Sequence, residues 1–115
     1  MISKKQKTAR KNFREDVFHQ VKGIPKGKVA TYGQISDKLR SMNYDLRINP
    51  RMVGWALHAN KSADVPCHRV VDRNGRLAPN FAFDGWKEQR RRLFAEGVRF
   101  KDEMHVDLSQ YLWNF

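Results

Sequence analysis

The sequence has 115 residues, of which 40% are hydrophobic, and this size and composition suit a single domain with one core. No apolar run is long enough to span a bilayer, and the basic N-terminal stretch lacks the apolar segment of a secretory signal. A lone cysteine cannot form an internal disulfide, so we expect a reducing compartment.

The charge balance is strongly positive. Lysine and arginine total 23 against 12 acidic residues, which gives a formal net charge of +11. A basic excess of this size on a small domain commonly serves a polyanion, and nucleic acid is the commonest one. Composition alone leaves open a solubilising surface, a ribosomal protein and a membrane-surface protein.

The N-terminal region divides into an arm and a helix. Residues 1–9 are basic and almost without apolar side chains, which predicts either a flexible arm that reaches phosphates or a solvated tail. Residues 10–115 are expected to form one domain. A helix over residues 10–22 is predicted by apolar residues spaced four and three apart, namely Phe13, Val17, Val21 and Ile24.

Two short helices are predicted next. Thr31 and Gln34 have the spacing of a capping box, which starts a helix that runs to about Arg40. Asn49 and Pro50 suit the N-cap and first position of a second helix, with Arg51 in its first turn. Two such helices in succession indicate a helix-turn-helix, whose second helix presents its N-terminal residues to a DNA groove.

A basic wing is predicted after these helices. Residues 67–71 have the pattern of a short strand, and Asn74-Gly75 is typical of a hairpin turn. Arg69, Arg73 and Arg76 surround this turn and make the predicted wing basic.

The C-terminal third is predicted to hold one helix and a hairpin. Asp84 is expected to cap the helix, Glu96-Gly97 to close it, and three side chains to face inward, namely Trp86, Leu93 and Phe94. Residues 98–108 alternate like a hairpin, and residues 111–113 are expected to pack back on the domain. The predicted fold is therefore mostly α with small β hairpins, similar to a winged helix-turn-helix.

The pair Cys67-His68 is the first candidate for chemistry. A thiol is a useful nucleophile only as the thiolate, so it needs a base or a positive field nearby. Neighbours on a strand point to opposite faces, so His68 could act on Cys67 only through water, and a buried inert cysteine is the simpler interpretation. A metal site is not expected, because the four histidines and the cysteine lack a ligand spacing. No cofactor is expected.

Several motifs in order identify a family. The chain resembles the DNA-binding, C-terminal domain of the O6-alkylguanine-DNA alkyltransferases, and still more the alkyltransferase-like proteins, from about Phe13 to Gly97. The motifs are Ile24-Pro25-Lys26-Gly27-Lys28-Val29, Thr31-Tyr32-Gly33, Arg51-Met52-Val53-Gly54, Asn60, Pro66-Cys67-His68-Arg69-Val70 and Glu96-Gly97.

The resemblance implies a role in DNA binding for several residues. Tyr32 matches the tyrosine that promotes rotation of the damaged nucleotide out of the stack, and Arg51 matches the arginine that fills the vacated space. Without the resemblance, Tyr32 reads as a core residue and Arg51 as a phosphate contact. The resemblance also places Thr31, Gly54 and Arg69 in the DNA-binding set.

The resemblance further implies alkyl transfer. Cys67 matches the alkyl acceptor, His68 the base that acts through water, Glu96 the carboxylate that orients the histidine, and Asn60 the hinge residue. The expected partner is double-stranded DNA containing O6-alkylguanine. The protein is expected to be a monomer that does not bind membranes and that is located in the cytoplasm (nucleoid-associated) or the nucleus.

One segment departs from the alkyltransferase pattern. Residues 77–85 lack the glycine-rich loop that grips the base in alkyltransferases, and here the chain looks like the alkyltransferase-like group. That group usually lacks the cysteine and flags the lesion for nucleotide excision repair, so the chain is either a single-turnover methyltransferase or a non-catalytic sensor. A winged-helix transcription factor is a third alternative. Phe81 and Phe83 are either pocket or core residues.

Overall fold

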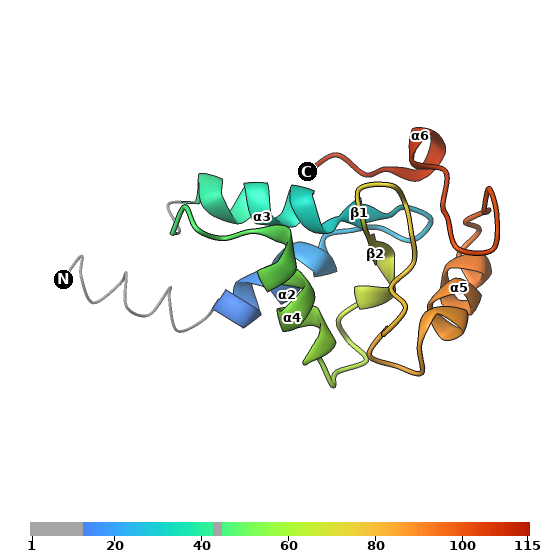
Figure 1. The fold of residues 1–115 in the computed structure, drawn as a ribbon, viewed down its shortest axis with the longest axis horizontal. Helices are drawn as coiled ribbons and strands as arrows, with labels where there is room; N and C mark the ends of the chain where they lie inside the picture. The colour runs from blue at the N-terminus through green and yellow to red at the C-terminus, as the bar shows by residue number, and fades with distance from the viewer. Residues whose placement is uncertain (1–12, 43–44) are drawn as a thin grey trace.

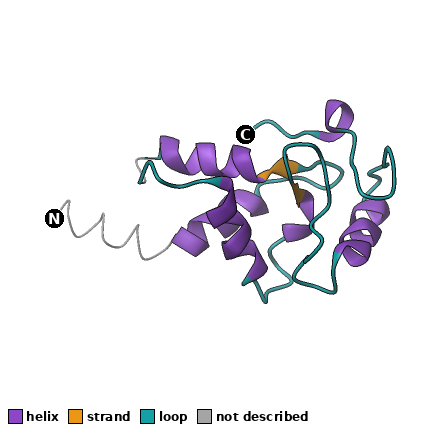
Figure 2. Ribbon diagram, viewed as in Figure 1, coloured by secondary structure: helices purple, strands orange, loops and turns teal. Residues whose placement is uncertain are grey.

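The computed structural model describes residues 13–42 and 45–115, and the predicted arm over residues 1–9 lies outside them. The described part is mostly helical with one two-stranded sheet, and none of its helices is long and apolar enough to cross a membrane (Figures 1 and 2). In chain order the elements are α2 (Phe13–Lys22), β1 (Ala30–Thr31), α3 (Tyr32–Ser41), α4 (Pro50–His58), the 3-10 helix η1 (Cys67–Arg69), β2 (Val70–Val71), α5 (Trp86–Ala95) and α6 (Leu108–Tyr111).

The helix starts follow from local hydrogen bonds, as predicted. The Thr31 hydroxyl accepts from the Gln34 backbone N–H at 3.1 Å, and the Gln34 side chain accepts from the Thr31 N–H at 2.8 Å. The Asn49 side chain accepts from the Met52 N–H at 3.1 Å, with Pro50 at the first helical position. These caps satisfy backbone donors that a helix cannot satisfy itself, so α3 and α4 begin where the sequence indicates.

The two-stranded sheet was not among the predicted elements. β1 pairs with β2 in parallel, with Ala30 opposite Val70 and Thr31 opposite Val71. The predicted strand over residues 67–71 is wrong in its first half, because Cys67–Arg69 form η1. Asn74-Gly75 does turn the chain, since the Gly75 N–H donates to Asp72 O at 2.9 Å, but this turn joins no strand pair of its own.

Packing separates the domain into two apolar clusters. In the first, α2, α3 and α4 pack together over Val17, Ile35 and Val53 (Figure 1). The second joins α5 and the C-terminal segment through Val29, Val71, Leu77, Leu93, Val98 and Val106. The sheet lies between these groups, because Ala30 and Val70 belong to the first cluster and Val71 to the second.

The C-terminal third corrects two predictions and confirms two. Gly85, not Asp84, is the N-cap of α5, and Asp84 has a positive φ of 76°. Leu93 is buried as predicted, but Phe94 is 56% exposed. The tail does pack back, since the Val29 N–H donates to Tyr111 O at 2.9 Å and the Trp113 N–H to Val29 O at 2.8 Å.

Candidate functional site

Cys67 lies at the wall of a cavity between α4 and the loop that precedes α5. The residue is only 5% exposed, and the Cys67 N–H donates to Val65 O at 2.8 Å, which fixes the start of η1. The cavity measures about 390 Å³, and it is lined by Tyr32, Gly54, Trp55, Leu57, His58, Cys67, Asp72, Arg76 and residues 77–82. Cys67 belongs to the first apolar cluster, but the cavity that it lines also reaches exposed residues of α4.

Gln89 holds the loop wall of this cavity in place. Its side chain is fully buried on α5 and accepts from the Ala78 N–H at 2.7 Å. The same carboxamide donates to His68 O at 3.2 Å and to Val70 O at 2.9 Å. One amide therefore ties the cavity loop to the segment that carries Cys67.

Asn60 contacts the sulfur from the end of α4. Its side-chain nitrogen lies 3.7 Å from Cys67 Sγ and donates to Ser62 O at 3.0 Å, while its oxygen accepts from the Ser62 N–H at 2.9 Å. Burial raises the pKa of the Cys67 thiol, and the Asn60 hydrogen bond and the charge of Arg92 oppose this rise. The thiol is therefore buried but faces groups that favour its ionised form.

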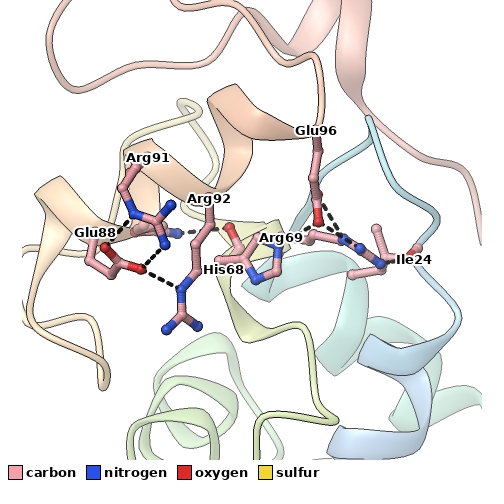
Figure 3. Close-up of polar contacts among 8 residues, drawn as sticks. Ile24, His68, Arg69, Glu88, Arg91, Arg92 and Glu96 are labelled. Carbon is pink, nitrogen blue, oxygen red and sulfur yellow. Dashed lines mark hydrogen bonds and ion pairs between the residues drawn. The ribbon is translucent and has the colours of Figure 1, made fainter.

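His68, Arg69 and Glu96 form a buried cluster behind the cysteine (Figure 3). His68 Nε2 lies 2.9 Å from Glu96 Oε2, and Arg69 donates to both carboxylate oxygens at 2.9 and 2.7 Å. A carboxylate only accepts, so Nε2 carries the hydrogen and Nδ1 is the nitrogen that can take a proton. Glu96 thus fixes the tautomer of His68.

Opposing effects set the protonation of this cluster. Burial works to raise the pKa of Glu96, but hydrogen bonds from Arg69 and His68 outweigh it and hold that pKa below its usual value. Burial, with the charges of Arg69 and Arg92, holds the pKa of His68 below its usual value, although the hydrogen bond and charge of Glu96 oppose this. At neutral pH the cluster therefore holds an ionised Glu96 and a neutral His68.

Arg69 lies inside the domain, and its predicted place in the DNA-binding set stays a prediction. Its side chain is 12% exposed, and besides Glu96 it donates to Ile24 O at 2.7 Å. A phosphate contact by Arg69 would break these internal bonds. The structure therefore gives Arg69 an internal role, connecting Glu96 to the end of α2, and removes it from the basic wing.

Tyr32 and Gly54 lie on facing sides of the cavity entrance. A Cβ placed on Gly54 would lie 3.9 Å from a ring carbon of Tyr32, so the two helices approach closely there. Burial raises the pKa of Tyr32 to about 12, which keeps its hydroxyl protonated. Thr31 is 9% exposed and its hydroxyl caps α3, so the predicted DNA roles of Thr31, Tyr32 and Gly54 stay predictions.

Exposed cations lie in the first turn of α4 and on the predicted wing, and an exposed aromatic side chain lines the cavity. Arg51 is exposed in the first turn of α4, and Trp55, 64% exposed, follows one turn later and lines the cavity. Arg73 and Arg76 are exposed on the predicted wing, and Arg76 lines the cavity as well. Among the described residues, no group of three or more His, Cys, Asp or Glu could hold a metal ion.

Three residues at this site were missed by sequence reasoning: Trp55, Gln89 and Arg92. A glutamine four residues before Leu93 lies on the inward face of α5, and that position was a usable indication. Trp55 lies four residues after Arg51, so the two share a face of α4, which was also readable from the spacing. Nothing in the sequence pattern distinguished Arg92 from Arg90 and Arg91.

Comparisons with known proteins agree with this geometry. Residues 12–98 match the family model described as "6-O-methylguanine DNA methyltransferase, DNA binding domain". Alkyltransferase-like protein 1 of Schizosaccharomyces pombe is 33% identical over 106 residues, covering 88% of this chain and 94% of that protein. The DNA base-flipping protein of Escherichia coli is 32% identical over 105 residues, covering 90% and 76%.

A methyltransferase and a DNA complex are also similar. The methylated-DNA–protein-cysteine methyltransferase of Saccharolobus islandicus is 41% identical over 91 residues, which cover 78% of this chain but only 54% of that protein. The crystal structure of S. pombe Atl1 with damaged DNA containing O6-carboxymethylguanine has a TM-score of 0.75 and 30% identity, covering 90% of this chain and 96% of that chain.

Proposed function

Because the chain belongs to the family of the 6-O-methylguanine DNA methyltransferase DNA-binding domain, we propose that it receives O6-alkylguanine from duplex DNA and transfers the alkyl group to Cys67. The observation that carries this proposal is the 390 Å³ cavity, which joins Cys67 to α4. Its volume lies in the range of small-molecule sites, roughly 300–1,000 Å³. A nucleotide rotated out of the stack fits such a cavity.

Duplex DNA docks on α4 in this proposal. Arg76 lines the cavity, and Arg51 lies one turn before Trp55, which lines it too. These exposed cations and Arg73 neutralise phosphates, so affinity depends steeply on salt. Arg51 enters the base stack at the place that the rotated nucleotide leaves. Tyr32, the first residue of α3, supports the rotation. Rotation costs a few kcal/mol, and a cation among the base edges offsets part of that cost.

The chemical step is a displacement at the alkyl carbon. The Cys67 proton passes through a water molecule to Nδ1 of His68, whose tautomer Glu96 fixes. The thiolate forms an S–C bond, the C–O6 bond breaks, and its electron pair stays on guanine, which takes up a proton. The thioether is stable, so each molecule reacts once.

Intact mass spectrometry tests this proposal. Protein in excess over a duplex containing O6-methylguanine is expected to gain one methyl group in place of the thiol hydrogen. Unmodified duplex and the Cys67→Ala variant serve as controls and are expected to give no adduct. An unchanged mass after long incubation with the lesion would contradict transfer.

A second candidate function is a non-catalytic sensor that flags the lesion for nucleotide excision repair. The loop over residues 77–85 favours it, because a single glycine, Gly85, stands where alkyltransferases have a glycine-rich loop. The raised pKa of Cys67 favours it as well, since little thiolate is present at neutral pH. A sensor binds the lesion duplex more tightly than the normal duplex, with Cys67→Ala unaffected and no adduct formed. Equal affinity for both duplexes would exclude this candidate.

A further inference from the structure

The side chain of Arg92 lies where α5 meets the Cys67-His68 segment. It lines a groove together with His68 and Pro66, and Figure 3 shows it next to His68. Its guanidinium carbon is also 5.5 Å from the ring centroid of Phe81, which lines the Cys67 cavity. Arg92 therefore places a positive charge close to both residues of the proposed reaction.

Three neighbours hold this guanidinium. Arg92 Nε donates to Glu88 Oε2 at 2.8 Å, and the guanidinium carbon lies 4.9 Å from the ring centroid of Phe83 as well as over Phe81. The side chain is 31% exposed, so its charge is less screened than that of a free surface arginine. Its orientation is fixed by an ion pair and two rings together.

Glu88 does not cancel this charge, because it is shared. Arg91 donates to both oxygens of Glu88 at 2.8 and 2.7 Å, and these bonds with that of Arg92 lower the pKa of Glu88 to about 2. Two arginines therefore surround one carboxylate, which leaves a net positive charge. Arg91 is 68% exposed on the outside of α5, whereas Arg92 faces the reactive segment.

We infer that Arg92 is a positioning residue whose fixed charge favours the thiolate of Cys67, and this role rests on the proposed alkyl transfer. A thiolate needs a positive field, and the neutral His68 does not supply one. Asp72 lines the same cavity as Cys67, and its carboxylate disfavours a second negative charge there. Among the described residues, the titratable and charged groups that line the cavity with Cys67 are Tyr32, His58, Asp72 and Arg76, and Arg92 acts on Cys67 from α5.

Alkylation of the thiol by iodoacetamide measures this effect without DNA. Cys67 is the only cysteine in the sequence, so its carbamidomethylation is read directly by intact mass at a series of pH values. Arg92→Gln is expected to move the midpoint of the pH–rate profile upward by roughly half a pH unit, with an unchanged plateau, which makes the reaction about threefold slower at neutral pH. Cys67→Ser gives the background from other side chains.

Matched variants separate charge from packing. Arg91→Gln loses a more exposed charge from the same ion-pair group and is expected to move the midpoint less than Arg92→Gln does. Arg92→Lys keeps the charge and is expected to keep the wild-type midpoint. Glu88→Gln removes the negative charge beside Arg92 and is expected to move the midpoint downward. This opposite sign tests the inference even where Arg92→Gln fails to fold.

Two results would overturn the inference. One is equal midpoints for Arg92→Gln and Arg91→Gln, and the other is a displacement by Arg92→Lys as large as that by Arg92→Gln. A displaced midpoint in Arg92→Gln together with no methyl transfer by the wild-type protein would reject the proposed function while the role of Arg92 stands. Methyl transfer by the wild-type protein together with an unchanged midpoint in Arg92→Gln would support the proposed function and reject the role of Arg92.

Discussion

The guanidinium carbon of Arg51 lies 5.4 Å from the ring centroid of Trp55, one turn further along α4. Both side chains are exposed, and Trp55 also lines the Cys67 cavity. A cation over an exposed ring is worth about 0.5–1 kcal/mol, which holds Arg51 in place but lets it leave when DNA binds. The pair connects the residue proposed to enter the stack with the cavity proposed to receive the base.

Arg51→Ala is expected to reduce discrimination more than general affinity. Without the cation, the gap left by the rotated nucleotide stays unfilled, so the preference for an O6-methylguanine duplex over the normal duplex falls about tenfold, or roughly 1.4 kcal/mol. Fluorescence anisotropy with both duplexes at one salt concentration measures the ratio. Arg91→Ala removes the same charge from α5 and serves as the control. Equal weakening on both duplexes would instead mark Arg51 as a phosphate contact.

Trp55 is expected to contact bound DNA. Trp55→Ala removes an exposed indole at the cavity entrance and should weaken lesion binding by about 1 kcal/mol, the lower end of base–aromatic stacking. Intrinsic fluorescence gives an independent measurement, because DNA should quench Trp55 and the Trp55→Phe variant should lose most of the change. If Trp55→Phe keeps the full fluorescence change, the contact is absent.

Glu96→Gln is expected to destabilise the fold in a pH-dependent way. At neutral pH the loss should be about 3 kcal/mol, because Arg69 keeps a buried charge without its carboxylate. The pKa of Glu96 is lowered in the folded state, so its stabilisation is present above the unfolded value near 4.5 and is lost as pH falls through the lowered folded value. The difference between variant and wild type in urea unfolding should therefore shrink below about pH 4.5.

The exposed Glu103 provides the matched control for that measurement. Glu103→Gln is expected to unfold like the wild type at every pH. A Glu96→Gln difference that stays constant down to pH values well below the usual carboxyl range would refute the ion-pair explanation.

Gln89→Leu is expected to cost about 3 kcal/mol, since it leaves the Ala78 N–H and the His68 and Val70 carbonyls without their buried partner. Urea unfolding should give a lower midpoint with an unchanged slope. Gln110→Leu changes an exposed glutamine in the same way and should stay within about 0.5 kcal/mol of wild type. Similar stability of the two variants would show that Gln89 does not tie the loop to η1.

Local features were predictable because their hydrogen bonds join residues a few positions apart. The capping box of Thr31 and Gln34 and the cap at Asn49 depend on spacings of three residues, and α3 and α4 begin at those caps. The prediction of a strand over residues 67–71 was wrong because strand pairing depends on residues far apart in the sequence. Val70 pairs with Ala30, forty positions earlier, and a local pattern carries no information about such a partner.

The sequence by itself determined the family, the two helices after Thr31 and Asn49, and the set Asn60, Cys67, His68 and Glu96, because each is carried by a short motif. Only the tertiary structure decided the surroundings of the sulfur. It turned Arg69 inward to Glu96, buried Gln89 between η1 and the cavity loop, and selected Arg92 from three consecutive arginines. The contact of Arg69 with Glu96 spans 27 positions and that of Gln89 with Val70 spans 19, whereas the contact of Arg92 depends on which face of α5 is covered. Packing fixes all three.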